Sequence, residues 1–331
     1  MTKLGIISFA HLHADLYAAA IRSLPNVELA GIFDENPNRA KQKAQEFETA
    51  PFDNVNALLE QDIQGVIVTA ENAKHRRYTE AAARAGKHVL CEKPIATTME
   101  DGQAMIDGCR NAGVQLMIAF ACRFCPPIYR AMQIVKEGAL GNILGLKGTN
   151  RGQMPGGWFT DKALAGGGAV MDHTVHLVDL WRWMLGREVK SVYAEISTLF
   201  YPDLGIDDAG LLLLQFQDGP FASIDASWSR PIPAYPTWGD VAMEIVGDQG
   251  SLTVDGLRQR LCLYGKESGK AEWLPWGDDM FQGVIRSFAR VAQEGTPPSV
   301  TGEDGLRALE VALAAYRSAE TGRTVELPLG G

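Results

Sequence analysis

The sequence predicts an α/β domain with a doubly wound parallel sheet, followed by an α+β domain with a large, mostly antiparallel open sheet. Two observations support this prediction. Over residues 1–121, short apolar segments of strand type alternate with helical segments, which is typical of βαβ units. From residue 189 onward, long strand-like runs are separated by turn residues, which favours an antiparallel sheet. We therefore expect two domains, residues 1–121 and 122–331.

The composition limits the classes of function. The chain has 331 residues, of which 46% are hydrophobic and 21% charged, as is ordinary for a globular protein. Its net charge of -9 argues against nucleic acid or an anionic membrane surface as a partner. No stretch reaches the roughly 20 apolar residues that a bilayer span requires, and we expect no signal peptide. Five cysteines, an odd number, suit a reducing compartment, so we expect the cytoplasm.

The first domain contains five clear strand candidates. Each is a short run rich in apolar and β-branched residues, and segments of helical composition alternate with them, as parallel strands require. We expect the strands at 3–9, 27–33, 65–69, 88–91 and 114–120, and helices at 15–23, about 39–44, 75–85 and 99–112.

The segment between residues 86 and 94 combines a helix end, a buried strand and a polar stop. Gly86 suits the left-handed cap of the helix before it. Pro94 cannot continue a central strand and favours an extended conformation at Lys93. Lys93 therefore lies just past the carboxyl end of a strand, where open α/β sheets bind their ligands, although a solvated surface lysine is the simpler alternative.

The turn after the first strand departs from the usual dinucleotide-binding pattern. G-x-G-x-x-G places glycines for close approach of a diphosphate, but the matching residues here are Ser8, Ala10 and His13. Small residues and an exposed helix N-terminus still favour a phosphate group, so Ser8, Phe9, Ala10 and His11 are candidate cofactor contacts. Without further support, a simple strand-to-helix turn would be the better interpretation.

Asp34 provides that support. It ends the second strand, about 20–25 residues beyond the turn, where an acidic residue binds the ribose hydroxyls of a dinucleotide. A carboxylate there repels a 2′-phosphate, so the sequence favours NAD over NADP. The alternative is that Asp34 caps the helix that follows.

In the second domain, Asp172, His176 and Asp179 are spaced i, i+4 and i+7 and therefore share one face of a helix. A carboxylate one turn before a histidine can orient its ring and raise its basicity, as in general base catalysis. Taken alone, the pair would more often be a surface contact. Asp172, His173 and His176 could also ligate a divalent ion, but we expect no metal, because too few ligands converge there.

Two further features of the second domain leave alternatives open. The glycine-rich segment 152–168 carries Trp158 and Phe159, which either cover a site in a mobile loop or fill the core. Cys122 and Cys125 lack a second cysteine pair for zinc, so we interpret them as two buried thiols.

The remaining elements complete the second domain. Pro126 and Pro127 break regular structure, and a helix follows at 128–137. One face of the expected sheet is covered by the Asp172 helix, and the other meets solvent or a second subunit, which predicts a homodimer or homotetramer formed through the sheet. We expect strands at 143–150, 189–201, 209–216, 221–228, 240–246, 251–254, 260–264 and 271–274, and helices at 281–294 and 305–321.

Taken together, these motifs resemble the Gfo/Idh/MocA oxidoreductases, which include glucose-fructose oxidoreductase and inositol dehydrogenase. The resemblance covers nearly the whole chain. It rests on the first turn, on Asp34, on Ala70-Glu71-Asn72 with His75, on the run from Ala85 to Pro94, and on Gly166-Gly167-Gly168 leading into Asp172-x-x-x-His176. Ser8 and Ala10 depart from the family's glycine pair, and Ala70-Glu71 from its usual Thr-Pro.

The resemblance implies roles for individual residues. Lys93 would be the catalytic lysine beside the nicotinamide and the substrate hydroxyl. Asp172 would hold the substrate and orient His176, which would act as general base in oxidation. Ala70, Asn72, His75 and Glu92 would lie near the cofactor, and Arg123, Arg151, Trp158 and His173 are candidate substrate contacts.

The expected reaction is hydride transfer between a secondary hydroxyl of a sugar, polyol or sugar derivative and NAD. Two alternatives stay open at this point. One is a non-catalytic sensor of nucleotide or sugar with the same fold, which the altered first turn permits. The other is a redox-neutral enzyme that keeps NAD tightly bound.

Overall fold

A computed structural model of the chain describes residues 1–232, 234–235, 237–264 and 271–330. The chain divides into two compact units. Unit 1 contains Met1–Ala121, Ala163–Gly166 and Met280–Leu309, and unit 2 contains Cys122–Lys162, Gly167–Asp279 and Glu310–Gly331. Among the helices of the described part, none has the length and apolar character that crossing a membrane requires.

Unit 1 is built on a six-stranded parallel sheet with the order β3-β2-β1-β4-β5-β6, which confirms the expected Rossmann-type fold. The predicted bounds of the second strand and of the strand before Lys93 match the structure. The elements of this part of the chain are β1 (Thr2–Ile7), α1 (His13–Ser23), β2 (Val27–Phe33), α2 (Pro37–Glu46), β3 (Pro51–Phe52), α3 (Val55–Leu59), β4 (Gly65–Val68), η1 (Asn72–Lys74), α4 (His75–Arg84), β5 (His88–Cys91), α5 (Met99–Asn111) and β6 (Leu116–Ile118).

Strand β5 is positioned by the residues on either side of it. Gly86 adopts φ 69° just after α4, which confirms the predicted left-handed turn. The strand then pairs with β4 and β6, and its last three residues are buried. Lys93 follows at the carboxyl end of this central strand and is joined to Pro94 by a cis peptide bond. The sheet therefore carries Lys93 to the edge where ligands of this fold bind.

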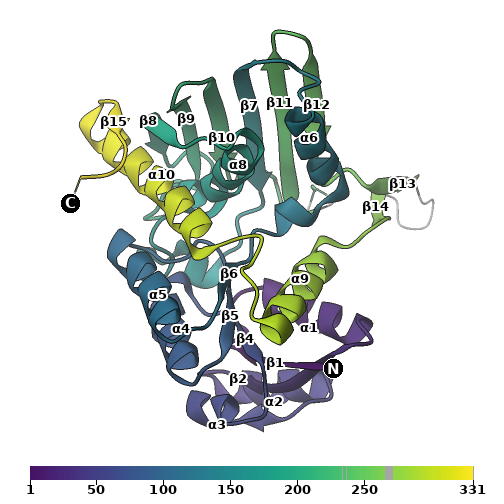
Figure 1. Ribbon diagram of the computed structural model, residues 1–331. Helices are drawn as coiled ribbons and strands as arrows, with labels where there is room; N and C mark the ends of the chain where they lie inside the picture. Colours follow the sequence, from purple (N-terminus) through teal and green to yellow (C-terminus); the bar gives the residue numbers. More distant parts are fainter. Residues whose placement is uncertain (233, 236, 265–270, 331) are drawn as a thin grey trace. The chain divides into compact units, whose positions relative to one another are not determined.

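Helix α9 (Met280–Glu294) corrects the predicted second domain. Residues 122–331 do not form one piece, because α9 packs against α1 and against strands β1 and β5 of unit 1. Figure 1 shows α1 and α9 side by side. The cause is the apolar face of α9, on which Val284, Ile285 and Phe288 are fully buried. This face covers the parallel sheet, which needs helices on both sides.

Unit 2 contains a seven-stranded sheet with the order β12-β11-β7-β10-β9-β8-β15. It is mostly antiparallel, as expected, with one parallel pair between β7 and β10. The remaining elements along the chain are η2 (Ala121–Phe124), α6 (Pro126–Lys136), β7 (Ile143–Gly152), η3 (Gly157–Thr160), α7 (Lys162–Ala165), α8 (Ala169–Leu185), β8 (Val189–Ser197), β9 (Ala209–Phe216), β10 (Phe221–Ser227), β11 (Gly239–Gly247), β12 (Ser251–Asp255), β13 (Arg260–Tyr264), β14 (Ala271–Pro275), α10 (Gly302–Thr321) and β15 (Val325–Glu326).

Pro126 and Pro127 do not interrupt structure as expected. They open α6 instead, because proline suits the first turn of a helix, where its missing N–H has no intrahelical partner.

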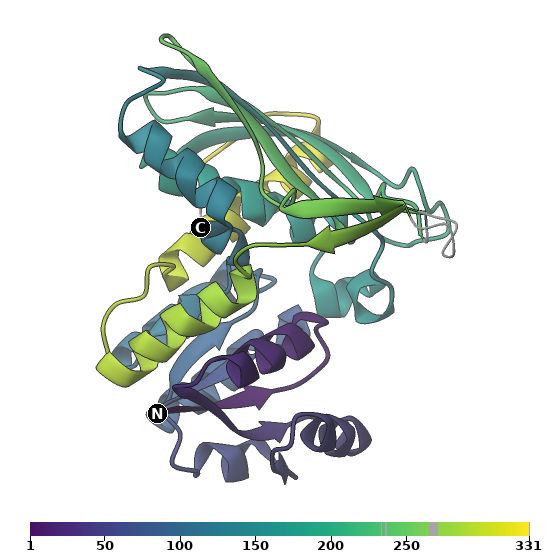
Figure 2. The same cartoon turned by 90° about the vertical axis from the view of Figure 1, so that its right-hand side faces the viewer.

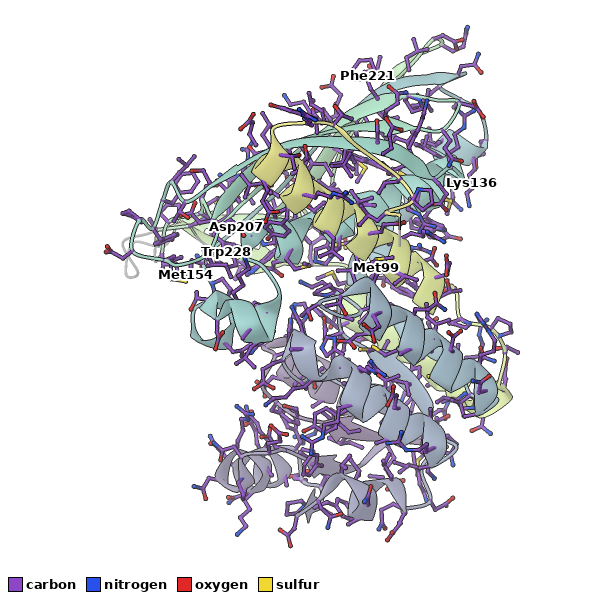
Figure 3. All side chains as sticks on the ribbon, turned by 90° about the vertical axis from the view of Figure 1, so that its left-hand side faces the viewer. Met99, Lys136, Met154, Asp207, Phe221 and Trp228 are labelled. Carbon is purple, nitrogen blue, oxygen red and sulfur yellow. The ribbon has the colours of Figure 1, made fainter. Side chains whose placement is uncertain are left out.

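The two faces of the large sheet differ. Helix α8 packs on β7, β9 and β10, and α6 packs on α8 and β12, so helices cover one face (Figure 2). Ala222, Ile224 and Ala226 of β10 are fully buried on this side. The opposite face carries Leu211 and Phe221, which are 56% and 65% exposed. Figure 3 shows Phe221 on this outer face.

Helix α8, which carries Asp172 and His176, begins at a cap contributed from elsewhere in the chain. The carboxylate of Asp207 accepts hydrogen bonds from the amides of Gly168 and Val170, both at 2.9 Å, and from the Tyr316 hydroxyl at 2.8 Å. A Cβ on Gly168 would lie 1.9 Å from the backbone oxygen of Asp207, so only glycine fits there. Asp207 therefore fixes where α8 begins.

Replacing Asp207 by alanine is expected to lower the free energy of unfolding by about 2 kcal/mol, because two helix amides and one buried hydroxyl lose their acceptor. Chemical denaturation monitored by circular dichroism measures this change. The control is Asp203→Ala, which removes an exposed carboxylate in the preceding loop and should leave the unfolding midpoint unchanged. Equal midpoints for both variants would contradict the capping role.

Candidate active site

The turn between β1 and α1 reproduces the backbone of a glycine turn without glycine. Ser8 has φ 75°, a left-handed conformation that residues other than glycine rarely adopt. Two hydrogen bonds hold it there: its amide donates to Phe33 O at 2.6 Å, and the Thr69 hydroxyl donates to Ser8 O at 2.6 Å. The predicted turn is therefore present, and neighbouring strands support its strain.

Side chains of Asp34 and of the turn itself already accept hydrogen bonds from several backbone amides here. The Phe9 amide donates to Asp34 at 2.6 Å, the Ala10 amide to the Ser8 hydroxyl at 3.1 Å, and the His13 amide to Nδ1 of His11 at 3.1 Å. In a glycine-rich turn such amides are left for the diphosphate. The residues still fit a dinucleotide, since α1 presents its N-terminus here and Ala10 is small, but fewer amides face the phosphates.

Asp34 lies at the end of β2, as predicted, and is buried. Each of its carboxylate oxygens accepts two hydrogen bonds: Oδ2 from the Phe9 amide and Arg39 Nε, and Oδ1 from the Asn36 amide and Arg39 Nη2. The alternative that Asp34 caps the next helix is wrong, because the Asn36 side chain accepts the first amides of α2. Asp34 thus ties the first turn to the end of β2.

Glu92 contacts both the N-terminal part of α1 and Lys93. Its side chain is fully buried, and its Oε1 accepts the Tyr17 hydroxyl at 2.5 Å and lies 3.0 Å from His13 Nδ1. Its Oε2 accepts the Lys93 amide at 3.1 Å and lies 3.9 Å from His11 Nε2. Glu92 therefore joins the first turn to Lys93, which is itself only 3% exposed.

Burial alone would raise the pKa of Glu92, but the His11 and His13 rings and the Lys93 side chain hold it well below its ordinary value of 4.5. Because the pKa is depressed in the folded protein, the ionised group stabilises the fold above pH 4.5. That contribution is lost as the pH falls below this value.

His11, His13 and Glu92 place one potential ligand atom each within 4.8 Å of the others, which raises the question of a metal ion. The hydrogen bonds favour a different interpretation. Nδ1 of His11 accepts the His13 amide, so the neutral ring carries its proton on Nε2, the atom nearest Glu92. The N-terminus of α1 also disfavours a cation. Across the residues that the structure describes, Asp172, His173 and His176 form no comparable group.

Ala70, Asn72 and His75 lie together in unit 1. Nε2 of His75 is 3.1 Å from Ala70 O, and Nδ1 is 3.0 Å from Pro94 O. His75 is fully buried, which lowers its pKa. The ring therefore connects the turn after β4 to the segment just beyond Lys93, while the Asn72 amide donates to Ala165 O at 2.9 Å.

In unit 2, Asp172 and His173 form a buried group on α8. Oδ2 of Asp172 lies 3.1 Å from Nε2 of His173 and accepts the Trp228 indole N–H at 3.3 Å. The His173 ring is fully buried and meets Trp238 edge to face, with ring centroids 5.1 Å apart. Trp228 and Asp207 are labelled in Figure 3. His173, the next residue along the chain, therefore contacts the Asp172 carboxylate.

His176 and Asp179 continue the same face of α8. Nδ1 of His176 lies 3.8 Å from the Cys122 thiol. Asp179 accepts two hydrogen bonds from Arg123, with Nε at 2.8 Å and Nη2 at 2.5 Å. Arg123 is buried and also lies 5.3 Å from the Trp183 ring, so it tethers η2 to α8. This contact gives Arg123 a positioning role that the sequence did not predict. Cys122 and Cys125 are buried thiols that form no disulfide, as expected.

The remaining predicted substrate contacts are not gathered at this group. Arg151 binds Asp225 at 2.9 Å on the sheet face opposite α8, so it lies apart from Asp172 and His176. Trp158 and Phe159 stack on each other at 4.0 Å. Phe159 is buried, as in the core-filling alternative, whereas Trp158 is partly exposed.

Sequence reasoning missed the supporting residues. Tyr17 and His13 hold Glu92, Trp228 holds Asp172, and Arg39 holds Asp34. Arg39 is only five residues from Asp34, and His11 and His13 form a His-x-His pair, so these residues offered a local signal. Tyr17 and Trp228 offered none, because they lie far along the chain from Glu92 and Asp172.

Comparisons with known proteins agree with this architecture. Residues 3–120 match the model of the oxidoreductase family with an NAD-binding Rossmann fold, and residues 128–253 match the GFO/IDH/MocA C-terminal domain. The chain is 27% identical over 336 residues to the myo-inositol 2-dehydrogenase of Thermotoga maritima, covering 98% of both chains. It is 30% identical over 277 residues to the 1,5-anhydro-D-fructose reductase of Ensifer adhaerens, covering 81% of both.

A solved structure extends the similarity. GenD2 from gentamicin A biosynthesis, in complex with NAD, superposes with a TM-score of 0.88 at 25% identity, covering 98% of this chain and 96% of that one. With two family models in the expected order, an NAD-binding Rossmann domain and a relative 30% identical across most of its length, this chain belongs to the GFO/IDH/MocA family of oxidoreductases.

Proposed function

We propose that this protein is an NAD-dependent dehydrogenase that transfers hydride between a secondary hydroxyl of a sugar or polyol and nicotinamide. The observation that carries the proposal is Lys93, a buried lysine fixed at the carboxyl end of a central strand in an NAD-binding domain. The related dehydrogenase and reductase, named for myo-inositol and 1,5-anhydro-D-fructose, support the substrate class.

The cofactor assigned to unit 1 is NAD. Asp34 would bind the adenosine ribose, and the turn of Ser8, Phe9, Ala10 and His11 would face the diphosphate. Ala70, Asn72, His75 and Glu92 would lie beside the rest of the cofactor. When bound, NAD accepts the hydride that leaves the substrate carbon. A 2′-phosphate would meet the Asp34 carboxylate, which makes NADP the weaker ligand.

The proton chemistry is assigned to Lys93 and His176. In oxidation, the hydroxyl proton passes from the substrate oxygen to the His176 ring, and hydride leaves the carbon that carries this oxygen. That carbon loses two electrons and becomes a carbonyl carbon. Lys93 polarises the oxygen and stabilises its developing negative charge. Asp172 holds the substrate, and His173 and Trp228 orient the Asp172 carboxylate. Trp158, partly exposed, is proposed as a stacking surface for the sugar ring.

Turnover of a sugar and polyol panel tests the function. Purified protein with NAD should convert at least one inositol, aldose or sugar derivative, with growth of the reduced-nicotinamide absorbance. The absorbance of the protein as purified separates ordinary turnover from a redox-neutral reaction on tightly held NAD. Micromolar NADH binding with no turnover of any panel member in either direction would contradict the proposal.

The outer face of the large sheet is proposed to pair with a second copy of this chain, giving a homodimer or homotetramer. Leu211, Leu213 and Phe221 expose apolar side chains on this face, and in the described part of the chain no helix covers it. Multi-angle light scattering at micromolar concentration should give a multiple of the 36.0 kDa chain mass. Leu213→Glu should shift the mass to one chain. A monomeric mass for the unmodified protein would contradict the interface.

The cytoplasm is the compartment we propose. None of the five cysteines forms a disulfide, and Cys91, Cys109, Cys122 and Cys125 are buried. Burial raises the pKa of Cys109 to about 12, so this thiol stays protonated. Cysteines without disulfides are typical of proteins in a reducing compartment.

A further inference from the structure

We propose that His13 and Tyr17 are positioning residues for Lys93, and that they act through Glu92. The inference rests on the proposed function, because it assumes that Lys93 takes part in the chemical step. It concerns residues of unit 1 alone.

The two oxygens of the Glu92 carboxylate form a bridge between α1 and Lys93. Oε1 of Glu92 receives the Tyr17 hydroxyl at 2.5 Å and His13 Nδ1 at 3.0 Å, both from the first two turns of α1. Because an ionised carboxylate only accepts hydrogen bonds, His13 must carry its proton on Nδ1. Oε2 of Glu92 accepts the backbone amide of Lys93 at 3.1 Å. Each oxygen thus holds a different part of the chain.

The α1 side of the bridge is itself fixed by packing. Phe281 of α9 meets the His13 ring edge to face at 5.1 Å and the Tyr17 ring at 5.6 Å. Tyr17 is fully buried, so close packing restrains its ring. These ring contacts restrain both donors, and their hydrogen bonds orient the Glu92 carboxylate.

The consequence concerns Lys93. A buried carboxylate that loses its donors must move toward others or become protonated, because an uncompensated buried charge is costly. Either change breaks the hydrogen bond from the Lys93 amide and shifts the backbone from which the Lys93 side chain extends. A displacement of about 1 Å at an acid–base group can cost on the order of 100-fold in rate. His13 and Tyr17 therefore affect the chemical step without touching the substrate.

The test separates positioning from cofactor binding. Tyr17→Phe and His13→Ala should each lower kcat about tenfold at saturating NAD and substrate, while the calorimetric Kd for NADH stays within about threefold. His13→Asn, whose amide can replace the Nδ1 donor, should restore most of kcat. Tyr78→Phe is the matched control, since it removes an equivalent bond from a buried tyrosine to Glu35 at 2.7 Å. It should leave kcat unchanged.

A second readout does not depend on turnover. In protein labelled with ¹⁵N-lysine, the Lys93 amide is identified by its loss in Lys93→Arg. Its hydrogen exchange should be faster in Tyr17→Phe and His13→Ala and unchanged in Tyr78→Phe. Unchanged kcat and exchange, or a weakened Kd for NADH with kcat intact, would overturn the inference. If the unmodified protein turns over no substrate, the proposed function fails, and the exchange rates alone decide this inference.

Discussion

Replacing Lys93 by alanine is expected to lower kcat at least roughly 100-fold at saturating NAD and substrate, the usual scale for losing acid–base help. Lys93 follows β5 at the ligand-binding edge of the parallel sheet, and it is almost completely buried. A water molecule in the space left by the side chain carries no net charge, so it stabilises negative charge on the substrate oxygen less than the lysine does. Steady-state rates of NADH formation measure the change.

The matched control for this variant is Lys41→Ala, which removes an exposed lysine of the same unit. Its kcat should equal that of the unmodified protein. Calorimetric binding of NADH to Lys93→Ala should persist, because Asp34 and the first turn are untouched. A kcat close to that of the unmodified protein would remove Lys93 from the mechanism.

Replacing His176 by glutamine is expected to lower kcat by about 100-fold or more, since the amide has no basic nitrogen to take the hydroxyl proton. The KM for the sugar should change far less, because glutamine keeps a hydrogen-bonding group of similar size. The fold should persist: α8 is anchored independently by the Asp207 cap and by the Arg123–Asp179 pair. Initial rates across sugar concentrations separate kcat from KM.

Thr174→Val provides the control on the same helix. Thr174 is fully buried, and its hydroxyl oxygen has no hydrogen-bond partner among the described residues. The valine variant should keep kcat and gain stability of about 1 kcal/mol, because an unsatisfied buried hydroxyl is removed. An active His176→Gln variant would assign the proton transfer to another group.

The sequence predicted those features of the fold that depend on local patterns. The bounds of β2, β5, β9 and β13 agree with the structure, because apolar runs between clear turn residues define them. The short β3 and α3 were missed, since two to five residues carry too little periodicity. The membership of α9 in unit 1 was also missed, because an amphipathic helix does not specify which sheet it covers.

The candidate site was predictable only in part. Lys93, Asp34 and the spacing of Asp172 and His176 could be read from position along strands and helices. Their partners could not, since Trp228 lies 56 residues from Asp172 and Tyr17 lies 75 residues from Glu92. Arg151 was predicted as a substrate contact, but it lies on the face of β7 opposite α8. Successive residues of a strand point to opposite faces of the sheet, so a shift of one residue decides the face.

The central claim is that unit 1 binds NAD through Asp34 and a turn that has lost its glycines. Calorimetric titration of nucleotide-stripped protein, separately with NADH and NADPH, tests it most directly. We predict micromolar binding of NADH and much weaker binding of NADPH, because the Asp34 carboxylate repels a 2′-phosphate. Binding of neither nucleotide, or equal binding of both, would contradict the account.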